Sequence, residues 1–202
     1  MAATNEQIVS FIELLGNLAV AECNKRIQQG KGFVVPSVCI AQSAHETGWG
    51  QSALMTKANA FFGIKAGGSW TGKVFTADTW EVANGEAYNT VANFRAYDSL
   101  ADSVADYYSL IVDNARYSKA VSTHPDNVKD AYTTLYEIWA GGYATDEEYV
   151  PNVWGLLEGR DLTQWDAKVD GVYVPPTGEG TTGTYVPPSI DTTTPQYIFA
   201  KI

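Results

Sequence analysis

The chain has 202 residues, 45% of them hydrophobic, and its 13 basic and 23 acidic residues give a net charge of −10. This composition predicts a globular protein with a real core rather than a disordered chain. No lysine or arginine cluster interrupts the acidic balance, which excludes nucleic acid as an expected partner and disfavours charge-driven binding to anionic membranes or walls. The two histidines and two cysteines lack metal-ligand spacing, so we predict no metal site.

Helical patterns cover the first 58 residues. A capping box at 4–7 (TNEQ) begins a helix that ends near Gly30, and Pro36 opens a second helix that runs to Glu46. A short third helix is expected over 52–58. Polar residues interrupt the apolar stretch at the N-terminus and no basic flank precedes it, so we expect neither a secretory signal nor a membrane segment there. Cys23 and Cys39 lie on neighbouring predicted helices, where the sequence leaves both a disulfide and two buried thiols open, and we favour the thiols because free cysteines are common in cores.

The pattern changes between Ser69 and Phe94. Alternating β-branched and polar residues predict two strands, and the Asn84-Gly85 pair is a typical hairpin turn. We therefore predict a β-hairpin inserted into a helical protein.

Helical patterns return after the hairpin. Ser99 and Asp102 form a second capping box, a further helix is expected over 127–140, and a third box at 145–148 (TDEE) opens a last helix that Pro151 should bend or restart. We also expect Arg95 and Asp98 to pair and to tie the end of the strand to the next helix.

After Trp165 the composition shifts to proline, threonine and glycine, and the tetrapeptide at 173–176 (YVPP) recurs 12 residues later. Such a segment is too poor in apolar residues to fold alone. We predict a domain over 1–166 and an extended tail or linker over 167–202, which could join another module, mediate self-association or lie along the domain as an extended strand.

The segment at 44–50 (AHETGWG) carries the main chemical signal. It places Glu46 at the end of an apolar helix and follows it with two glycines that flank Trp49. A carboxyl group at the boundary between core and groove is partly desolvated, which raises its pKa towards the range of a general acid. The pattern predicts a glycosidase. His45 points about 100° away from Glu46 on the helix and is expected to be structural.

Four stretches, at 41–52, 58–65, 94–99 and 142–146, resemble in order the motifs of glycoside hydrolase family 73, the peptidoglycan-cleaving N-acetylglucosaminidases of bacteria and phages. The resemblance spans about residues 8–166. It implies a lysozyme-like α+β fold and hydrolysis of the β-1,4 bond between N-acetylglucosamine and N-acetylmuramic acid. It also implies that Glu46 is the general acid and that no cofactor is needed.

Glycoside hydrolysis also needs a second group at the oxocarbenium-like centre, either a carboxylate or the acetamido group of the substrate. The family places a second glutamate where Glu81 lies on the first predicted strand, with Asp78 and Glu86 as weaker candidates. Tyr143 matches a family tyrosine near the reacting sugar. Sugars present both apolar faces and hydroxyl groups, and the candidate substrate-binding residues are Trp49, Asn59, Phe62, Lys65, Trp70 and Trp80.

Two alternatives remain open at this point. One is a lytic transglycosylase of the same fold, and the other is a non-catalytic wall-binding or virion structural module. For the hydrolase we expect peptidoglycan glycan strands as the partner and the bacterial cell wall as the place of action, reached by phage delivery or by secretion with a trimmed signal.

Overall fold

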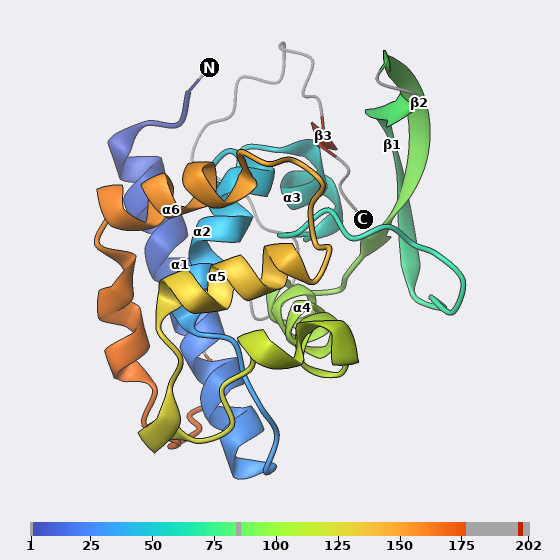
Figure 1. The fold of residues 1–202 in the computed structure, drawn as a ribbon. Coiled ribbons are helices and arrows are strands. Elements are labelled where there is room, and N and C mark those ends of the chain that lie inside the picture. Colours follow the sequence, from blue (N-terminus) through green and yellow to red (C-terminus); the bar gives the residue numbers. More distant parts are fainter. Residues whose placement is uncertain (1, 84–85, 177–197, 200–202) are drawn as a thin grey trace.

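A computed structural model describes residues 2–83, 86–176 and 198–199, with the side chains of 79–89 and 198–199 outside this description. A helical body stands beside a long β-hairpin (Figure 1), so the predicted α+β class is confirmed. The α-helices are α1 (Asn5–Gln28), α2 (Pro36–Thr47), α3 (Ala53–Ala58), α4 (Leu100–Val112), α5 (Ala131–Ala140) and α6 (Tyr149–Gly159). The strands are β1 (Lys73–Ala83), β2 (Glu86–Ala96) and β3 (Ile198–Phe199), and three 3₁₀ helices are η1 (Ala115–Ala120), η2 (Pro125–Asn127) and η3 (Leu162–Lys168).

The helix α2 lies at the centre of the body and packs against α1, α6 and η3. Every residue from Pro36 to Ala44 is buried. The predicted starts of the first two helices are confirmed, because Thr4 forms its capping box with Gln7 and Pro36 occupies the first turn of α2. The most buried helix of the fold therefore leads to Glu46.

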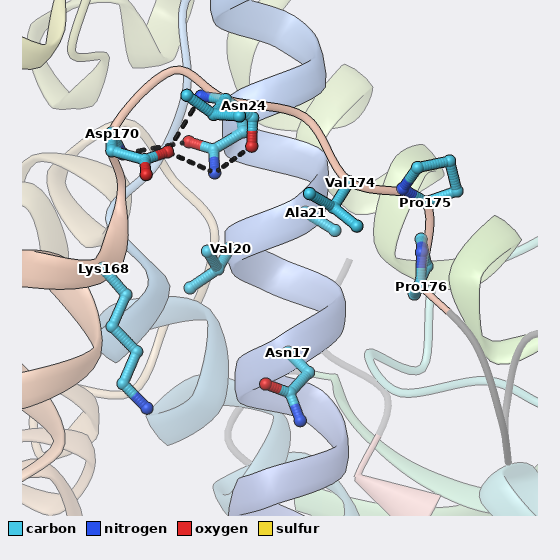
Figure 2. Close-up of a pocket in the computed structure, with 10 residues that line it drawn as sticks. Asn17, Val20, Ala21, Asn24, Lys168, Asp170, Val174, Pro175 and Pro176 are labelled. Atoms are coloured by element: carbon cyan, nitrogen blue, oxygen red, sulfur yellow. Dashed lines mark hydrogen bonds between the residues drawn. The ribbon is translucent and has the colours of Figure 1, made fainter.

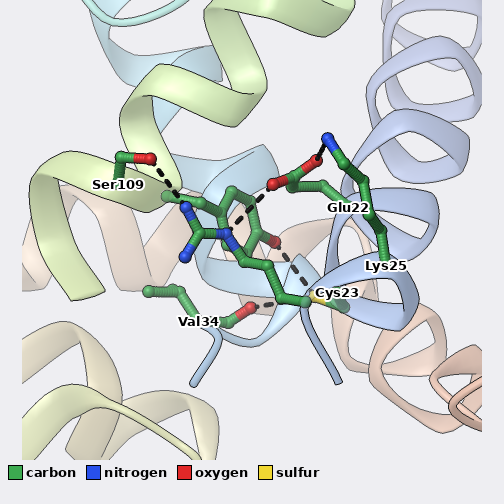
Figure 3. A network of polar contacts seen from close by, with 7 residues as sticks. Glu22, Cys23, Lys25, Val34 and Ser109 are labelled. Atoms are coloured by element: carbon green, nitrogen blue, oxygen red, sulfur yellow. Dashed lines mark hydrogen bonds and ion pairs between the residues drawn. The ribbon is translucent and has the colours of Figure 1, made fainter. Parts of the chain in front are cut away.

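The two cysteines are free and fully buried, which decides the alternative that the sequence left open. The Sγ atom of Cys23 lies 3.3 Å from both the Val34 carbonyl oxygen and the Tyr108 hydroxyl group (Figure 3). Burial raises the pKa of both thiols well above its ordinary value. They are therefore inert core residues rather than reactive groups.

A buried arginine joins α1 to α4 in the same region. Arg26 is 3% exposed. It donates to Glu22 at 3.0 Å on its own helix and to the Ser109 hydroxyl group at 2.8 Å on α4. A buried guanidinium needs partners for its charge, and these contacts therefore tie α1 to α4.

The predicted hairpin is confirmed, and its register runs from Lys73 opposite Ala96 to Ala83 opposite Glu86. The expected Asn84-Gly85 turn lies outside the described residues. At the base of the hairpin, Phe94 is fully buried in a small core with Leu54 and Ala58. This core fixes the hairpin to α3.

The expected pair between Arg95 and Asp98 is wrong. The chain turns at Ser99, and α4 brings Asp106 beside Arg95, whose Nη1 lies 3.0 and 2.9 Å from the two carboxylate oxygens. The Asp98 side chain stays exposed and pairs with Lys73. The strand end is tied to α4 as expected, but through a residue further along that helix.

Three predicted features of the last helices are wrong. The helix expected from 127 begins at Ala131, because Asp130 is the residue that caps it, accepting from the Thr133 amide at 2.8 Å. The capping box at 145–148 does not form, since Asp146 accepts from the Glu148 amide in a turn before α6. Pro151 therefore falls in the first turn of α6, where a missing N–H costs no helical bond, and it does not interrupt the helix.

The segment after η3 returns along α1 (Figure 2). Asn24 donates to the Asp170 carboxylate and to the Val172 carbonyl oxygen, both at 3.1 Å, and accepts from the Gly171 amide at 2.9 Å. A pocket of about 420 Å³ lies between this segment and α1. Further along, β3 pairs in parallel with β1. Within the described ranges, no helix combines the length and apolar character that crossing a bilayer requires.

Candidate active site

Glu46 is the penultimate residue of α2, and its side chain is 8% exposed. The helix ends sharply because Gly48, Trp49 and Gly50 have positive φ angles of 58°, 61° and 83°. Thr47 locks this end, since its hydroxyl group donates to the Ser43 carbonyl oxygen at 2.7 Å and accepts from the Gly50 amide at 2.9 Å. The carboxyl group is thus delivered from a rigid support, and it lies deeper than the partly exposed position expected from the sequence.

Two buried tyrosines lie beside Glu46. The rings of Tyr143 and Tyr149 are 5.9 Å apart, and neither residue is more than 1% exposed. Burial raises the pKa of both hydroxyl groups, and the nearby Glu46 charge raises it further. Both tyrosines are therefore neutral hydrogen-bonding groups. Among the described residues, the Tyr143 hydroxyl group has no hydrogen-bond partner.

The position of Tyr143 depends on the two glycines before it. A Cβ atom at Gly141 would lie 2.5 Å from the ring of Tyr117, and Gly142 has a φ of 88°. The chain can therefore leave α5 in a tight turn, closed by the Tyr143 amide and the Ile138 carbonyl oxygen at 3.3 Å. This turn directs Tyr143 back towards the end of α2.

Two of the predicted sugar-binding residues belong to the body of the domain. Trp49 is partly buried, and its ring meets Phe11 edge to face at 5.9 Å. Phe62 is 3% exposed and stacks on Tyr107 at 4.0 Å. These contacts support the core, and sugar binding by either ring stays a prediction.

Three others lie at the base of the hairpin. Asn59 is buried, with a φ of 50°, and its Nδ2 donates to the carbonyl oxygens of Tyr97 and Asp98, both at 3.2 Å. Trp70 is half-buried and donates to the Lys73 carbonyl oxygen at 2.9 Å. Lys65 forms a backbone bridge to Phe94. These contacts hold the loops together, and a role in binding sugar stays a prediction for all three.

The remaining predicted residues, Trp80 and Glu81, lie on β1 opposite Asn89 and Tyr88 of β2. Their side chains are outside the described part of the chain. The pairing of Glu81 with Glu46 therefore stays a prediction.

Residues 24–162 match the Glucosaminidase family, described as mannosyl-glycoprotein endo-beta-N-acetylglucosaminidase. The chain belongs to this family. The exo-glucosaminidase LytG of Bacillus subtilis is 35% identical over 139 residues, which are 67% of this chain and 48% of LytG. The chain thus spans about half the length of that curated relative.

Solved structures of similar proteins support the glucosaminidase fold. The catalytic domain of the autolysin Auto from Listeria monocytogenes has a TM-score of 0.65 and 32% identity, covering 82% of this chain and 91% of that domain. A truncated glycoside hydrolase domain of FlgJ from Salmonella typhimurium has a TM-score of 0.58 and 29% identity, covering 75% of this chain and 96% of that domain. The family and the lysozyme-like α+β fold implied by the sequence motifs are confirmed.

The sequence reasoning missed a buried polar group in this glucosaminidase domain. Gln42 on α2 is fully buried, and it contacts the hydroxyl groups of Tyr107 on α4 and Tyr149 on α6. A signal was present, because Gln42 is an amide on a mainly apolar helix, four residues before Glu46. Its partners come from distant helices and carry no comparable signal.

The described residues offer no cluster of three histidine, cysteine, aspartate or glutamate side chains able to hold a metal ion. The pocket in Figure 2 lies between α1 and the segment after η3, and none of the predicted site residues lines it.

Proposed function

We propose that this domain hydrolyses β-1,4 bonds between N-acetylglucosamine and N-acetylmuramic acid within peptidoglycan strands, at the bacterial cell wall. The observation that carries the proposal is the nearly buried Glu46 carboxyl group, held at the rigid end of α2 beside Tyr143 and Tyr149 in a chain of the glucosaminidase family. The names of the relatives, which include a peptidoglycan hydrolase from Salmonella typhimurium, support peptidoglycan as the substrate class.

Each residue has a defined task in this proposal. Breaking the glycosidic bond requires a carboxylic acid that protonates the leaving oxygen, and Glu46 supplies it. The Tyr143 hydroxyl group offers a hydrogen bond without a charge, either to the acetamido group of the sugar or to the developing charge. Glu81 or the substrate's own acetamido group then stabilises the oxocarbenium-like centre.

The first test measures new reducing ends released from purified peptidoglycan by the full chain. Since loss of a general acid typically costs a factor of about 100 to 10,000, Glu46→Gln should reduce release by at least about 100-fold. Glu158→Gln is the matched control, because Glu158 is an exposed glutamate near the end of α6. Normal activity in the Glu46→Gln variant would contradict the proposal.

The same assay separates the two ways of completing the mechanism. Glu81→Gln should reduce release strongly if a second carboxylate takes part, and should leave most of it if the substrate acetamido group does.

The identity of the products tests the reaction type. A hydrolase leaves N-acetylglucosamine at the new reducing end, whereas a lytic transglycosylase leaves a 1,6-anhydro sugar lighter by one water. Cleavage within strands yields long fragments, which an enzyme acting from the ends does not produce, and binding without cleavage would indicate a wall-binding module.

A further inference from the structure

A buried chain of hydrogen bonds links three helices beneath the candidate acid. Gln42 lies one turn before Glu46, so the two side chains share a face of α2. The Tyr107 hydroxyl group on α4 donates to Gln42 Oε1, and Gln42 Nε2 donates to the Tyr149 hydroxyl group on α6 at 2.8 Å. The three side chains that form these hydrogen bonds are fully buried. The chain of hydrogen bonds ends at the tyrosine that interacts with Glu46.

The direction of these bonds follows from the orientation of the Gln42 amide, whose Oε1 faces Tyr107 and whose Nε2 faces Tyr149. An amide oxygen only accepts hydrogen bonds and an amide nitrogen only donates them. Tyr107 must therefore give its hydrogen to Gln42, and Tyr149 must accept one. The hydrogen of the Tyr149 hydroxyl group consequently points away from Gln42.

The surroundings of Tyr149 limit where that hydrogen can point. The His45 ring meets the Tyr149 ring edge to face at 5.3 Å, and the Tyr143 ring lies 5.9 Å away. Burial raises the pKa of the Tyr149 hydroxyl group, and the charge of the nearby Glu46 raises it further. A carboxylate is a better acceptor for a buried hydroxyl dipole than an aromatic ring is.

We propose that Tyr107 and Gln42 orient the Tyr149 hydroxyl group so that its hydrogen faces the Glu46 carboxyl group, which makes all three positioning residues for the acid. This inference rests on the proposed function of Glu46. A dipole that presents its hydrogen to a buried carboxyl group stabilises the ionised form, so the three residues set how readily Glu46 releases its proton.

The neighbouring tyrosines and thiol stay neutral, so a change in the pH profile is expected to report on Glu46. Tyr143, Tyr149 and Tyr117 face this cluster from the loop after α5, from α6 and from η1, and burial raises the pKa of each. Cys39 on α2 is likewise held neutral by burial. His45 also contacts Tyr149, and because histidine is the residue type that changes charge near neutral pH, its contribution must be separated by experiment.

The experiment is the pH profile of kcat/KM for reducing-end release by the full chain. Tyr149→Phe removes the oriented hydrogen, so Glu46 should hold its proton more tightly and the alkaline limb should move up by about one pH unit. Gln42→Met and Tyr107→Phe should move it in the same direction by less, because they only free the hydroxyl group to rotate. A His45→Asn background should preserve the shift.

Tyr108→Phe is the matched control. Tyr108 is also fully buried on α4, but its hydroxyl group contacts Cys23 instead of Gln42. This variant loses the same atom and should keep the alkaline limb of the unaltered chain. An equal shift in Tyr108→Phe, or unshifted limbs in Tyr149→Phe and Gln42→Met, would overturn the inference.

A second measurement does not depend on turnover. Carbon-13 NMR of the chain labelled at the glutamate carboxyl carbon gives the titration of Glu46 directly, with its resonance identified by its loss in Glu46→Gln. The resonance should titrate at higher pH in Tyr149→Phe and Gln42→Met, and identical titrations would overturn the inference even in an active enzyme. If the unaltered chain releases no reducing ends, the proposed function fails, while this titration still tests the hydrogen-bond chain.

Discussion

The Tyr143 hydroxyl group is buried at 1% exposure and has no hydrogen-bond partner among the described residues. Leaving such a group unsatisfied costs about 1–3 kcal/mol, so its retention needs an explanation. A partner that arrives with the substrate would provide one. We therefore propose that Tyr143 serves the reaction rather than the folded state.

We expect Tyr143→Phe to lower kcat for reducing-end release by about 10-fold or more, because the substrate loses a hydrogen bond in the transition state. The free energy of unfolding in urea should stay constant or rise, since the variant removes an unsatisfied polar atom. Tyr117→Phe, at a buried tyrosine of the same cluster, should retain activity. A Tyr143→Phe chain that is fully active but less stable would contradict this role.

At the residue scale, the sequence is most informative where one short segment contains the whole signal. Glu46 could be singled out because a helix end, two glycines and a tryptophan adjoin it in the chain. Gln42, Tyr107 and Tyr149 could not be joined, because their contacts depend on the packing of three helices. Asn59 illustrates a different limit, since its type suits sugar binding while its Nδ2 donates to two backbone carbonyl oxygens.

At the scale of elements, capping motifs predicted the starts of helices correctly where no other hydrogen bond competed with the cap. The boxes at Thr4 and Ser99 form as expected. The box at 145–148 does not form because the Asp146 carboxylate accepts from the Glu148 amide within its own turn. Local bonds of this kind, from a side chain to the backbone, compete with helix caps. The hairpin was predictable from alternation and turn residues, whereas the partner of Arg95 depended on how α4 crosses the strand.

The start of α2 offers a test at this scale. Asp166 on η3 accepts from the Ser37 amide at 2.7 Å and from its hydroxyl group at 2.6 Å. Burial raises the pKa of Asp166 to about 6 despite these two bonds. The folded chain then holds this proton more tightly than the unfolded chain, so stability should fall as pH rises from about 4 to about 6.

Asp166→Asn should remove this loss, which is at most about 3 kcal/mol, because asparagine does not titrate and still offers an oxygen to Ser37. Urea unfolding at several pH values between about 4 and 7 would measure the slope. The exposed Asp161→Asn on the same connection should keep the slope of the unaltered chain. Equal slopes in Asp166→Asn and the unaltered chain would show that the pKa of Asp166 is the same in the folded and the unfolded chain.

At the scale of the whole molecule, contacts that hold α1 come from both sides of the compositional boundary after Trp165. Trp165 packs where Gly16 leaves room on α1, since a Cβ atom there would lie 2.5 Å from the indole ring. Residues 170–172 then bond to Asn24, which is 5% exposed. Composition could not predict this, because the contacts involve backbone groups and a single asparagine rather than a run of apolar residues.

We therefore expect a chain ending at Asp166 to be less stable to urea than one ending at Pro176. The shorter chain loses the hydrogen bonds between Asn24 and residues 170–172, each of which contributes about 0.5–1.5 kcal/mol. Asn24→Ala should destabilise the longer chain and have little effect on the shorter one, so the two changes should not add. Asn17→Ala, at an exposed asparagine lining the same pocket (Figure 2), should affect neither chain. Equal stability of the two lengths would instead place the domain boundary at 166, because the contacts of Asp170 and Gly171 would then contribute nothing to the folded state.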